Sequence, residues 1–286
     1  MNPLKEFYYL NFQEYGVSGQ VGLNMVEYIW ENKGLVASDF LRQNVAKVFD
    51  TTNLETSKTR KEVSLIDLFD LSKVNHFVDV GANNLARINE VARKYPNIKL
   101  FTAIDVVPQS RVFRYPEKSN YIQISQDSFD YPIESHSCDF INLEFVLHHF
   151  KSESLIKSHI KTFKRVLKPG GILLLWEESF ENSVNVGSLV ENNNKLSIMT
   201  NFDLTSKFYS LTPSQRLQFI KINDWIINVN IPHMQWTGQW KPWEKWMDLF
   251  LEEGFLLTNK YNLGLRVNGR LKQDVHIVGQ LTASYF

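Results

Sequence analysis

The chain has 286 residues, 31 basic and 31 acidic side chains, and a hydrophobic content of 43%, which suffices for one large domain with an insertion. Its formal net charge of zero provides no broad positive field that would attract nucleic acid or an acidic membrane surface. The single cysteine, Cys138, excludes an internal disulfide, and no run of about 18 apolar residues occurs, so we expect a cytoplasmic protein without a membrane segment.

The first 62 residues are predicted to form a helical cap. Apolar residues recur at three- and four-residue spacing over 20–32 and again over 37–49, a pattern typical of amphipathic helices. A polar connection follows, and residues 63–71 predict a third helix that leads into the first strand.

A strand, a tight turn and a helix follow one another over residues 76–87. The apolar run ends at Gly81, and helical spacing begins at Leu85. Such a junction directs free backbone N–H groups at a ligand. A dinucleotide pyrophosphate would need three glycines here, and only Gly81 is present. The amino-acid end of a smaller nucleotide is the alternative, because the amides of Asn83 and Asn84 suit a carboxylate and an ammonium.

Four more strands are predicted to alternate with helices, which indicates a mostly parallel sheet with right-handed crossovers. The carboxylate of Asp105 comes at the end of the second strand, where it could accept both hydroxyls of a ribose. The strands are expected at 99–107, 121–125, 140–143 and 172–176, and the helices at 144–150 and 153–167.

The alternation stops over residues 177–241, which we interpret as an inserted lid. Thr212 to Gln215 read as a capping box with proline at the first helical position, so a helix should begin there. A further helix is expected over 242–254. The strand-like runs 255–267 and 271–281 are joined by Asn-Gly, which predicts a closing antiparallel pair.

Five segments of the chain are informative together through their order and spacing: Val78–Asn83, Ile104–Asp105, Gln126–Ser128, Cys138–His149 and Leu167–Leu173. In this order and spacing they resemble the class I S-adenosylmethionine-dependent methyltransferases. The resemblance covers roughly residues 63–281 and implies an α/β, Rossmann-like fold with seven strands, mostly parallel, and S-adenosylmethionine as cofactor. We therefore divide the chain into a cap (1–62), a core (63–176), a lid (177–241) and the end of the core (242–286).

The resemblance also implies roles for single residues. Asp79 and Gly81 match the acid and the first glycine of the family's loop, whereas Asn83 and Leu85 stand where later glycines are usual. Asp105 matches the ribose-binding acid. Asp79 and Asp105 could instead cap a helix or form a turn. The residues predicted to bind the cofactor are Asp79, Gly81, Ala82, Asn83, Asp105, Val106, Asp127 and Ser128 (at the adenine), and Leu143.

Methyl transfer is an in-line displacement, so catalysis depends mainly on holding the nucleophile about 3 Å from the methyl carbon. A base is needed only if the nucleophile must lose a proton. Of the adjacent His148 and His149, only one should face the site, because neighbouring helical residues point about 100° apart; both could instead be packing or surface histidines. The predicted catalytic candidates are His148, His149, Glu144 and Glu177.

A metal held by Glu144, Glu177 and Glu178 is an alternative, but no ligand spacing demands it and no metal site is predicted. The two glutamates after the fifth strand could also belong to a solvated loop.

The acceptor is predicted to be a small, partly apolar molecule, methylated on an O or N atom. After the fourth strand the chain has Asn142-Leu-Glu-Phe145 rather than the Asn/Asp-Pro-Pro-Tyr turn of adenine-nitrogen enzymes. The aromatic lid residues suit an acceptor pocket, although they could equally form the lid's own core or a homodimer contact. The predicted substrate-binding residues are Trp176, Glu178, Trp225, His233 and Trp236.

Two other functions stay open at this point. An RNA or protein methyltransferase would need a basic face, and the best candidate is formed by Lys157, Lys161, Lys164 and Arg165. A non-catalytic binding or scaffold subunit with the same fold is suggested by the missing glycines.

Overall fold

The computed structural model describes residues 2–14, 23, 24, 27, 69–106, 118–125, 127–184, 201–228, 238–265 and 275–285. The helices predicted over 20–32, 37–49 and 63–71 lie almost entirely outside the described residues. Among the helices that are described, none is both long and apolar enough to cross a lipid bilayer.

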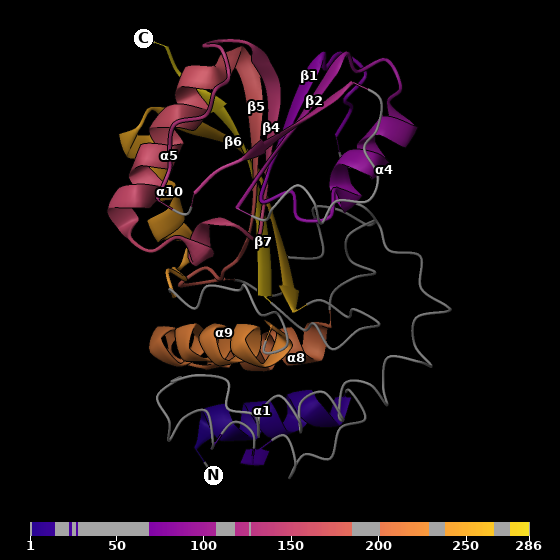
Figure 1. Ribbon diagram of the computed structural model, residues 1–286. Coiled ribbons are helices and arrows are strands. Elements are labelled where there is room, and N and C mark those ends of the chain that lie inside the picture. Colours follow the sequence, from indigo (N-terminus) through magenta and orange to yellow (C-terminus); the bar gives the residue numbers. More distant parts are fainter. Residues whose placement is uncertain are drawn as a thin grey trace.

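A seven-stranded sheet forms the centre of the molecule, in the order β3-β2-β1-β4-β5-β7-β6 (Figure 1). Neighbouring strands from β3 to β5 are parallel, whereas β7 is antiparallel to both β5 and β6. The predicted Rossmann-like sheet with a closing antiparallel pair is therefore confirmed. The strands are β1 (His76–Val80), β2 (Leu100–Asp105), β3 (Ser119–Gln123), β4 (Cys138–Glu144), β5 (Leu167–Glu178), β6 (Phe255–Leu265) and β7 (Val275–Ala283).

Helices cover both faces of this sheet. Figure 1 shows α5 and α10 on one face and α4 on the other, and each face has its own apolar core. The amphipathic pattern of α5 explains its packing, because its inward positions Ile156, Ile160 and Phe163 are fully buried. The described helical segments are α1 (Pro3–Glu14), α4 (Ala86–Lys94), the 3-10 turn η3 (Leu147–His149), α5 (Glu153–Val166), α8 (Phe202–Ser210), α9 (Pro213–Asn228) and α10 (Trp243–Glu252).

The helix predicted over 144–150 is wrong. Glu144 is the last residue of β4 and pairs with Trp176 of β5, so sheet hydrogen bonding holds it in an extended conformation. Only the single turn η3 follows, and α5 begins after Ser152, whose hydroxyl accepts a hydrogen bond from the Leu155 N–H at 3.2 Å. Strand β5 also continues two residues beyond its predicted end, which places Glu177 and Glu178 in the sheet rather than in a loop.

The helices α8 and α9 lie beyond the carboxyl ends of the parallel strands, with α1 on their far side (Figure 1). The predicted capping box at the start of α9 is confirmed: Gln215 N–H donates to Thr212 Oγ1 at 3.3 Å, and Thr212 N–H donates to Gln215 Oε1 at 3.0 Å. The ring of Phe7 on α1 contacts Phe219 on α9, with centroids 4.9 Å apart.

A buried arginine ties α9 to the end of the core. The guanidinium of Arg216 donates hydrogen bonds to the carbonyl oxygens of Glu181, Asn182, Tyr209 and Leu211, at 2.9 to 3.0 Å. Charge-assisted bonds of this kind compensate the desolvation of a buried cation. The segment that follows β5 and the two lid helices are thus held together, while the division into cap, core and lid stays a prediction.

Candidate functional site

The turn after β1 is built around Asp79. The register of β1 and β4 sets Asp79 beside Asn142, whose side-chain amide donates to the Asp79 carboxylate at 2.8 Å. Burial raises the pKa of Asp79 to about 7, because the charged carboxylate loses its hydration. A cationic group of a ligand at this position would favour the ionised form.

The chain then turns back onto the end of β2. The N–H groups of Gly81 and Ala82 both donate to the carbonyl oxygen of Ile104, at 2.8 and 3.2 Å. The N–H of Asn83 donates to the carboxylate of Asp105 at 2.6 Å. Asp105 therefore stabilises the turn that follows the strand of Asp79, although the two acids lie in different predicted motifs, and the turn-forming role considered for Asp105 is observed.

The two positions where glycine is usual have glycine-like backbones. Asn83 has φ 43° and Leu85 has φ 62°, and Gly81 has φ 74°. Asparagine visits this left-handed region readily, but a branched residue such as leucine does so at a cost. Leu85 is fully buried and packs with Ile88 and Val91 in the α4 core, which offsets that cost. The chain thus keeps the loop conformation without the glycines.

The other predicted cofactor residues are more dispersed. Leu143 and Ala82 are buried, whereas Val106 is 40% exposed. Asp127 is exposed and forms an ion pair with Lys151, with Nζ and Oδ1 2.8 Å apart; Ser128 lies half-buried beside it. Contacts of these residues with a cofactor stay predictions.

Glu144, a predicted catalytic residue, has a structural partner. Its carboxylate binds Arg87 of α4 through two hydrogen bonds, to Nε at 2.8 Å and to Nη2 at 2.7 Å. A bidentate pair of this kind holds α4 against the end of β4. Arg87 also pairs with Glu90, one turn further along α4. This arrangement favours a positioning role for Glu144.

His148 and Glu177 form a buried pair at the ends of β4 and β5. His148 Nδ1 lies 2.6 Å from Glu177 Oε2, and the side chains are 1% and 0% exposed. Glu177 Oε1 accepts hydrogen bonds from the N–H groups of Val146 and Leu147, at 3.1 and 2.7 Å. A carboxylate that accepts these bonds requires Nδ1 to be the donor, so in the neutral imidazole Nε2 carries the lone pair. Of the two predicted histidines, only His148 is fully buried.

Aromatic side chains surround this pair on two sides. The ring of Trp240 stacks on His148 with centroids 5.4 Å apart, and the ring of His149 lies 4.0 Å from His148. Beyond them, Trp176 contacts Phe145 and His276, at centroid distances of 4.8 and 5.6 Å.

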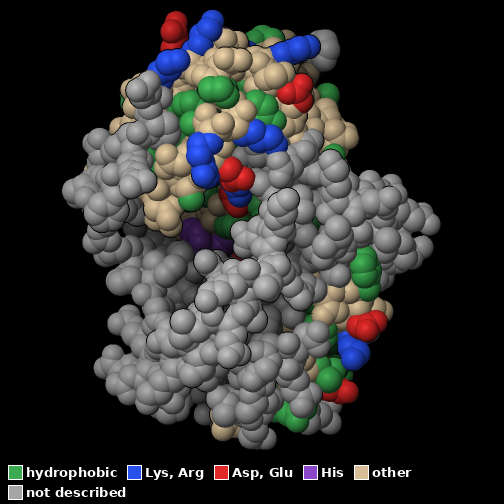
Figure 2. Space-filling view, turned by 90° about the vertical axis from the view of Figure 1, so that its right-hand side faces the viewer, with side chains coloured by type: hydrophobic (Ala, Val, Ile, Leu, Met, Phe, Trp, Pro, Cys, Tyr) green, Lys and Arg blue, Asp and Glu red, His purple; other side chains and the backbone are tan. Residues whose placement is uncertain are grey.

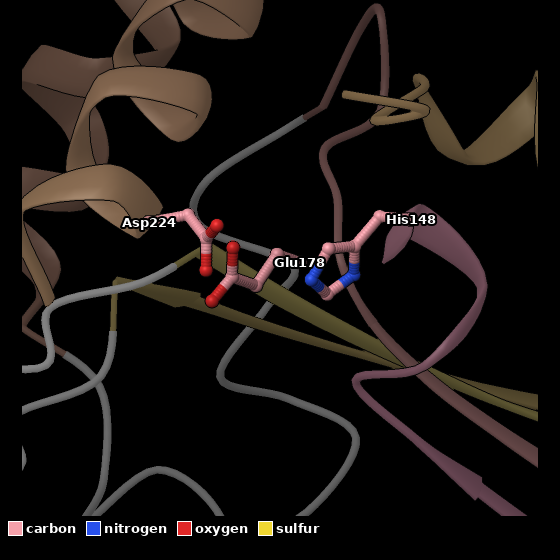
Figure 3. Close-up of side chains that lie close together, drawn as sticks. All are labelled: His148, Glu178 and Asp224. Atoms are coloured by element: carbon pink, nitrogen blue, oxygen red, sulfur yellow. The ribbon is translucent and has the colours of Figure 1, made fainter. Parts of the chain in front are cut away.

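Two more acidic groups meet His148 beside α9. Figure 3 shows the imidazole of His148 facing Glu178, whose carboxylate faces that of Asp224 on α9. All three side chains are buried, and one ligand atom from each lies within 4.8 Å of the others. Asp224 was not among the predicted residues. Its signal was an acid four residues after the apolar Ile220, on the same side of an expected helix.

His276 was also missed, because its position depends on the pairing of β7 with β5, which sets it beside Glu178. His233 and Trp236 lie outside the described residues. Trp225 is part of α9, but its side chain lies outside the description. Over the described part of one face, basic and acidic side chains are interspersed, and histidine side chains lie in a recess below them (Figure 2).

The order of the seven strands, with an acid and a glycine in the turn after β1, defines a class I S-adenosylmethionine-dependent methyltransferase. A model of the O-methyltransferase domain family matches residues 36–201, which is more than half of the chain. The chain belongs to this family, whose cofactor is S-adenosylmethionine.

The individual proteins that resemble this chain either match a short part of it or have low sequence identity to it. A tRNA N(3)-cytidine methyltransferase, METTL2 of Danio rerio, is 39% identical over 75 residues, which are 26% of this chain and 21% of that protein. The structure of the methyltransferase CalO6 superposes with a TM-score of 0.51 at 16% identity, covering 84% of this chain and 70% of CalO6. Human N-acetylserotonin methyltransferase in complex with SAM gives 0.46 at 16% identity, covering 96% of this chain and 62% of that one.

Proposed function

We propose that this chain transfers the methyl group of S-adenosylmethionine to an O or N atom of a small, partly apolar acceptor. The observation that carries the proposal is the buried His148–Glu177 pair, which lies at the carboxyl ends of β4 and β5. Ligands of open parallel sheets bind at this edge. The aromatic ring of Trp240, which stacks on His148, suits an apolar acceptor.

The residues around the first turn fit the proposed cofactor. S-adenosylmethionine supplies a methyl group on a positively charged sulfonium. The buried carboxylate of Asp79, whose raised pKa would return toward normal beside a cation, suits the ligand's ammonium. The carboxylate of Asp105 stands at the end of β2, where it would accept ribose hydroxyls. The adenine assignment of Asp127 has less support, because this side chain is exposed and paired with Lys151.

His148 is the group that would take a proton from the acceptor. Its Nδ1–H is bound by Glu177, so Nε2 is the basic nitrogen, and the imidazolium formed on protonation would be stabilised by the same carboxylate. Glu177 is in turn fixed by two backbone N–H groups. Glu177 is therefore assigned as a positioning residue, and His149 as a packing neighbour of His148.

Methylation of RNA is the second candidate, and the 75-residue match to a tRNA methyltransferase is the observation in its favour. The basic face that such a function would use is largely neutralised in this chain. Lys157 pairs with Glu252, Lys161 with Glu253, and Arg165 with Asp130. A small acceptor therefore fits better.

A labelled-methyl assay on a fractionated cell extract tests the proposal. We expect label from S-adenosylmethionine to appear in small molecules, and His148→Ala to abolish transfer while His149→Ala leaves most of it. Glu177→Gln should lower the turnover rate far more than the cofactor affinity, because it disturbs only the orientation and basicity of the imidazole. Label found only in macromolecules would overturn the proposal in favour of RNA or protein. Failure to bind S-adenosylmethionine at millimolar concentration in calorimetry would favour the scaffold function.

A further inference from the structure

We propose that His148, Glu178 and Asp224 form a binding site for a divalent transition-metal cation, with Zn²⁺ and Mn²⁺ as the best matched ions. The part of this inference that concerns the acceptor rests on the proposed function, but the metal site itself does not. The site joins η3, the last residue of β5 and the middle of α9.

The three side chains present a compact set of donors. One ligand atom from each lies within 4.8 Å of the others, and all three residues are buried. Two donors on one tetrahedral cation are about 3.3–3.6 Å apart when each bond is about 2.0–2.2 Å long. Donor atoms at the 4.8 Å limit would therefore have to approach by about 1.2–1.5 Å, which rotation of the two carboxylates can supply. Figure 3 shows Glu178 between the other two side chains, with its carboxylate beside that of Asp224 and the imidazole of His148 on its other side.

A second observation concerns the orientation of the imidazole. In metal sites, a ligating histidine usually donates its other ring N–H to a carboxylate, which fixes the tautomer and directs the ligating nitrogen at the metal. His148 has this arrangement, since its Nδ1 lies 2.6 Å from Glu177. Glu177 is itself held by the N–H groups of Val146 and Leu147. Nε2 is thus the nitrogen that faces Glu178 and Asp224.

The charges of the cluster also favour a cation. Glu178 and Asp224 approach each other in a buried environment, and Glu177 adds a third carboxylate on the far side of the His148 ring. Like charges at such distances repel strongly where water does not screen them. A divalent cation between the carboxylates converts this repulsion into attraction.

The donor set indicates the kind of ion. One imidazole nitrogen and two carboxylate oxygens suit Zn²⁺ and Mn²⁺ better than Ca²⁺, which prefers oxygen ligands alone, or Cu⁺, which prefers sulfur. Three protein ligands leave positions open for an exogenous oxygen, as in catalytic sites. We infer that an acceptor hydroxyl binds there and, with its pKa lowered by the ion, releases its proton to solvent before methyl transfer. In the metal-loaded protein, the ion would then activate the acceptor, because Nε2 of His148 is a metal ligand and does not take the proton.

The site is tested by calorimetry: the full chain is first freed of metal with a chelator and is then titrated with ZnCl₂ or with MnCl₂. We expect one equivalent of either ion to bind and to raise the melting temperature of the wild type. Glu178→Gln and Asp224→Asn should each weaken binding at least tenfold, and Glu177→Gln about 10- to 100-fold. Asp203→Asn, an exposed acid in the first turn of α8, is the matched control and should leave the affinity within twofold.

Two outcomes would overturn the inference: neither ion binds the wild type at millimolar concentration, or both cluster variants bind as tightly as Asp203→Asn. The wild-type titration decides even if a variant fails to fold. If the chelated wild type binds neither ion and still transfers methyl groups, the metal site is refuted and the proposed function stands. If the protein binds a metal ion but does not bind S-adenosylmethionine, the proposed function is refuted and the metal site stands.

Discussion

Replacement of Gly81 by alanine would test the geometry of the turn after β1 most directly. A Cβ added at Gly81 would lie 2.4 Å from a methyl carbon of Val146, whereas ordinary contacts of this kind are about 3.5–4.0 Å. The backbone at Gly81 also has φ 74°, which alanine adopts only with strain. The substitution therefore combines a steric overlap with a conformational penalty.

The two contributions can be separated with Gly170. That residue has φ 76°, but no described atom lies within 4 Å of its added Cβ. Gly170→Ala should therefore cost only the conformational part, about 1–2 kcal/mol, less about 0.4–1 kcal/mol gained because the unfolded chain becomes stiffer. Gly81→Ala should cost about 1–3 kcal/mol more, which is typical of overpacking in a rigid core.

The steric overlap can be measured as a coupling energy by urea denaturation of the wild type, the two single variants and the double variant. In a double-mutant cycle of Gly81→Ala with Val146→Ala, removal of the valine methyls should recover about 1–3 kcal/mol of the free energy of unfolding. Gly170→Ala with Val146→Ala should be additive within about 0.5 kcal/mol. Equal losses for Gly81→Ala and Gly170→Ala, or additivity in the first cycle, would refute the close packing of this turn against Val146.

Two further predictions concern the same turn and the lid. Because burial raises the pKa of Asp79 from 3.8 to about 7, its contribution to folding stability is full below the unfolded pKa and is lost as the pH rises toward 7. A bound sulfonium ligand favours the ionised carboxylate, so S-adenosylmethionine affinity in calorimetry should increase with pH, up to tenfold per unit, and level off above about 7. Asp79→Asn should flatten this dependence, and a flat wild-type profile would contradict it. Thr212→Ala should lower the free energy of unfolding by about 1 kcal/mol through loss of the N-cap bond to Gln215, whereas Ser214→Ala, an exposed neighbour, should change it by less than about 0.5 kcal/mol; equal effects would show that the cap contributes nothing.

Whether a prediction about the fold was correct depends on how far apart in the chain the residues are that determine the structure. Alternation and apolar runs over a few residues predicted the strands, and the capping box and the Asn-Gly pair predicted the start of α9 and the antiparallel end of the sheet. The predicted helix over 144–150 failed because pairing with β5 extended β4 to Glu144. Helices α1 and α8 were not predicted; α1 packs its aromatic side chains on the lid helices.

By itself, the sequence determined the strand, turn and helix around Asp79 and Gly81, because these depend on local backbone preferences and on the spacing of apolar residues. It also identified His148, Glu177 and Glu178 as polar groups near strand ends. Only the tertiary structure decided that Glu144 binds Arg87 and that His148 is held by Glu177. It also decided that Asp224 joins the cluster. These contacts link strands and helices far apart in the chain, and their partners follow from sheet register and helix packing, which no local pattern encodes.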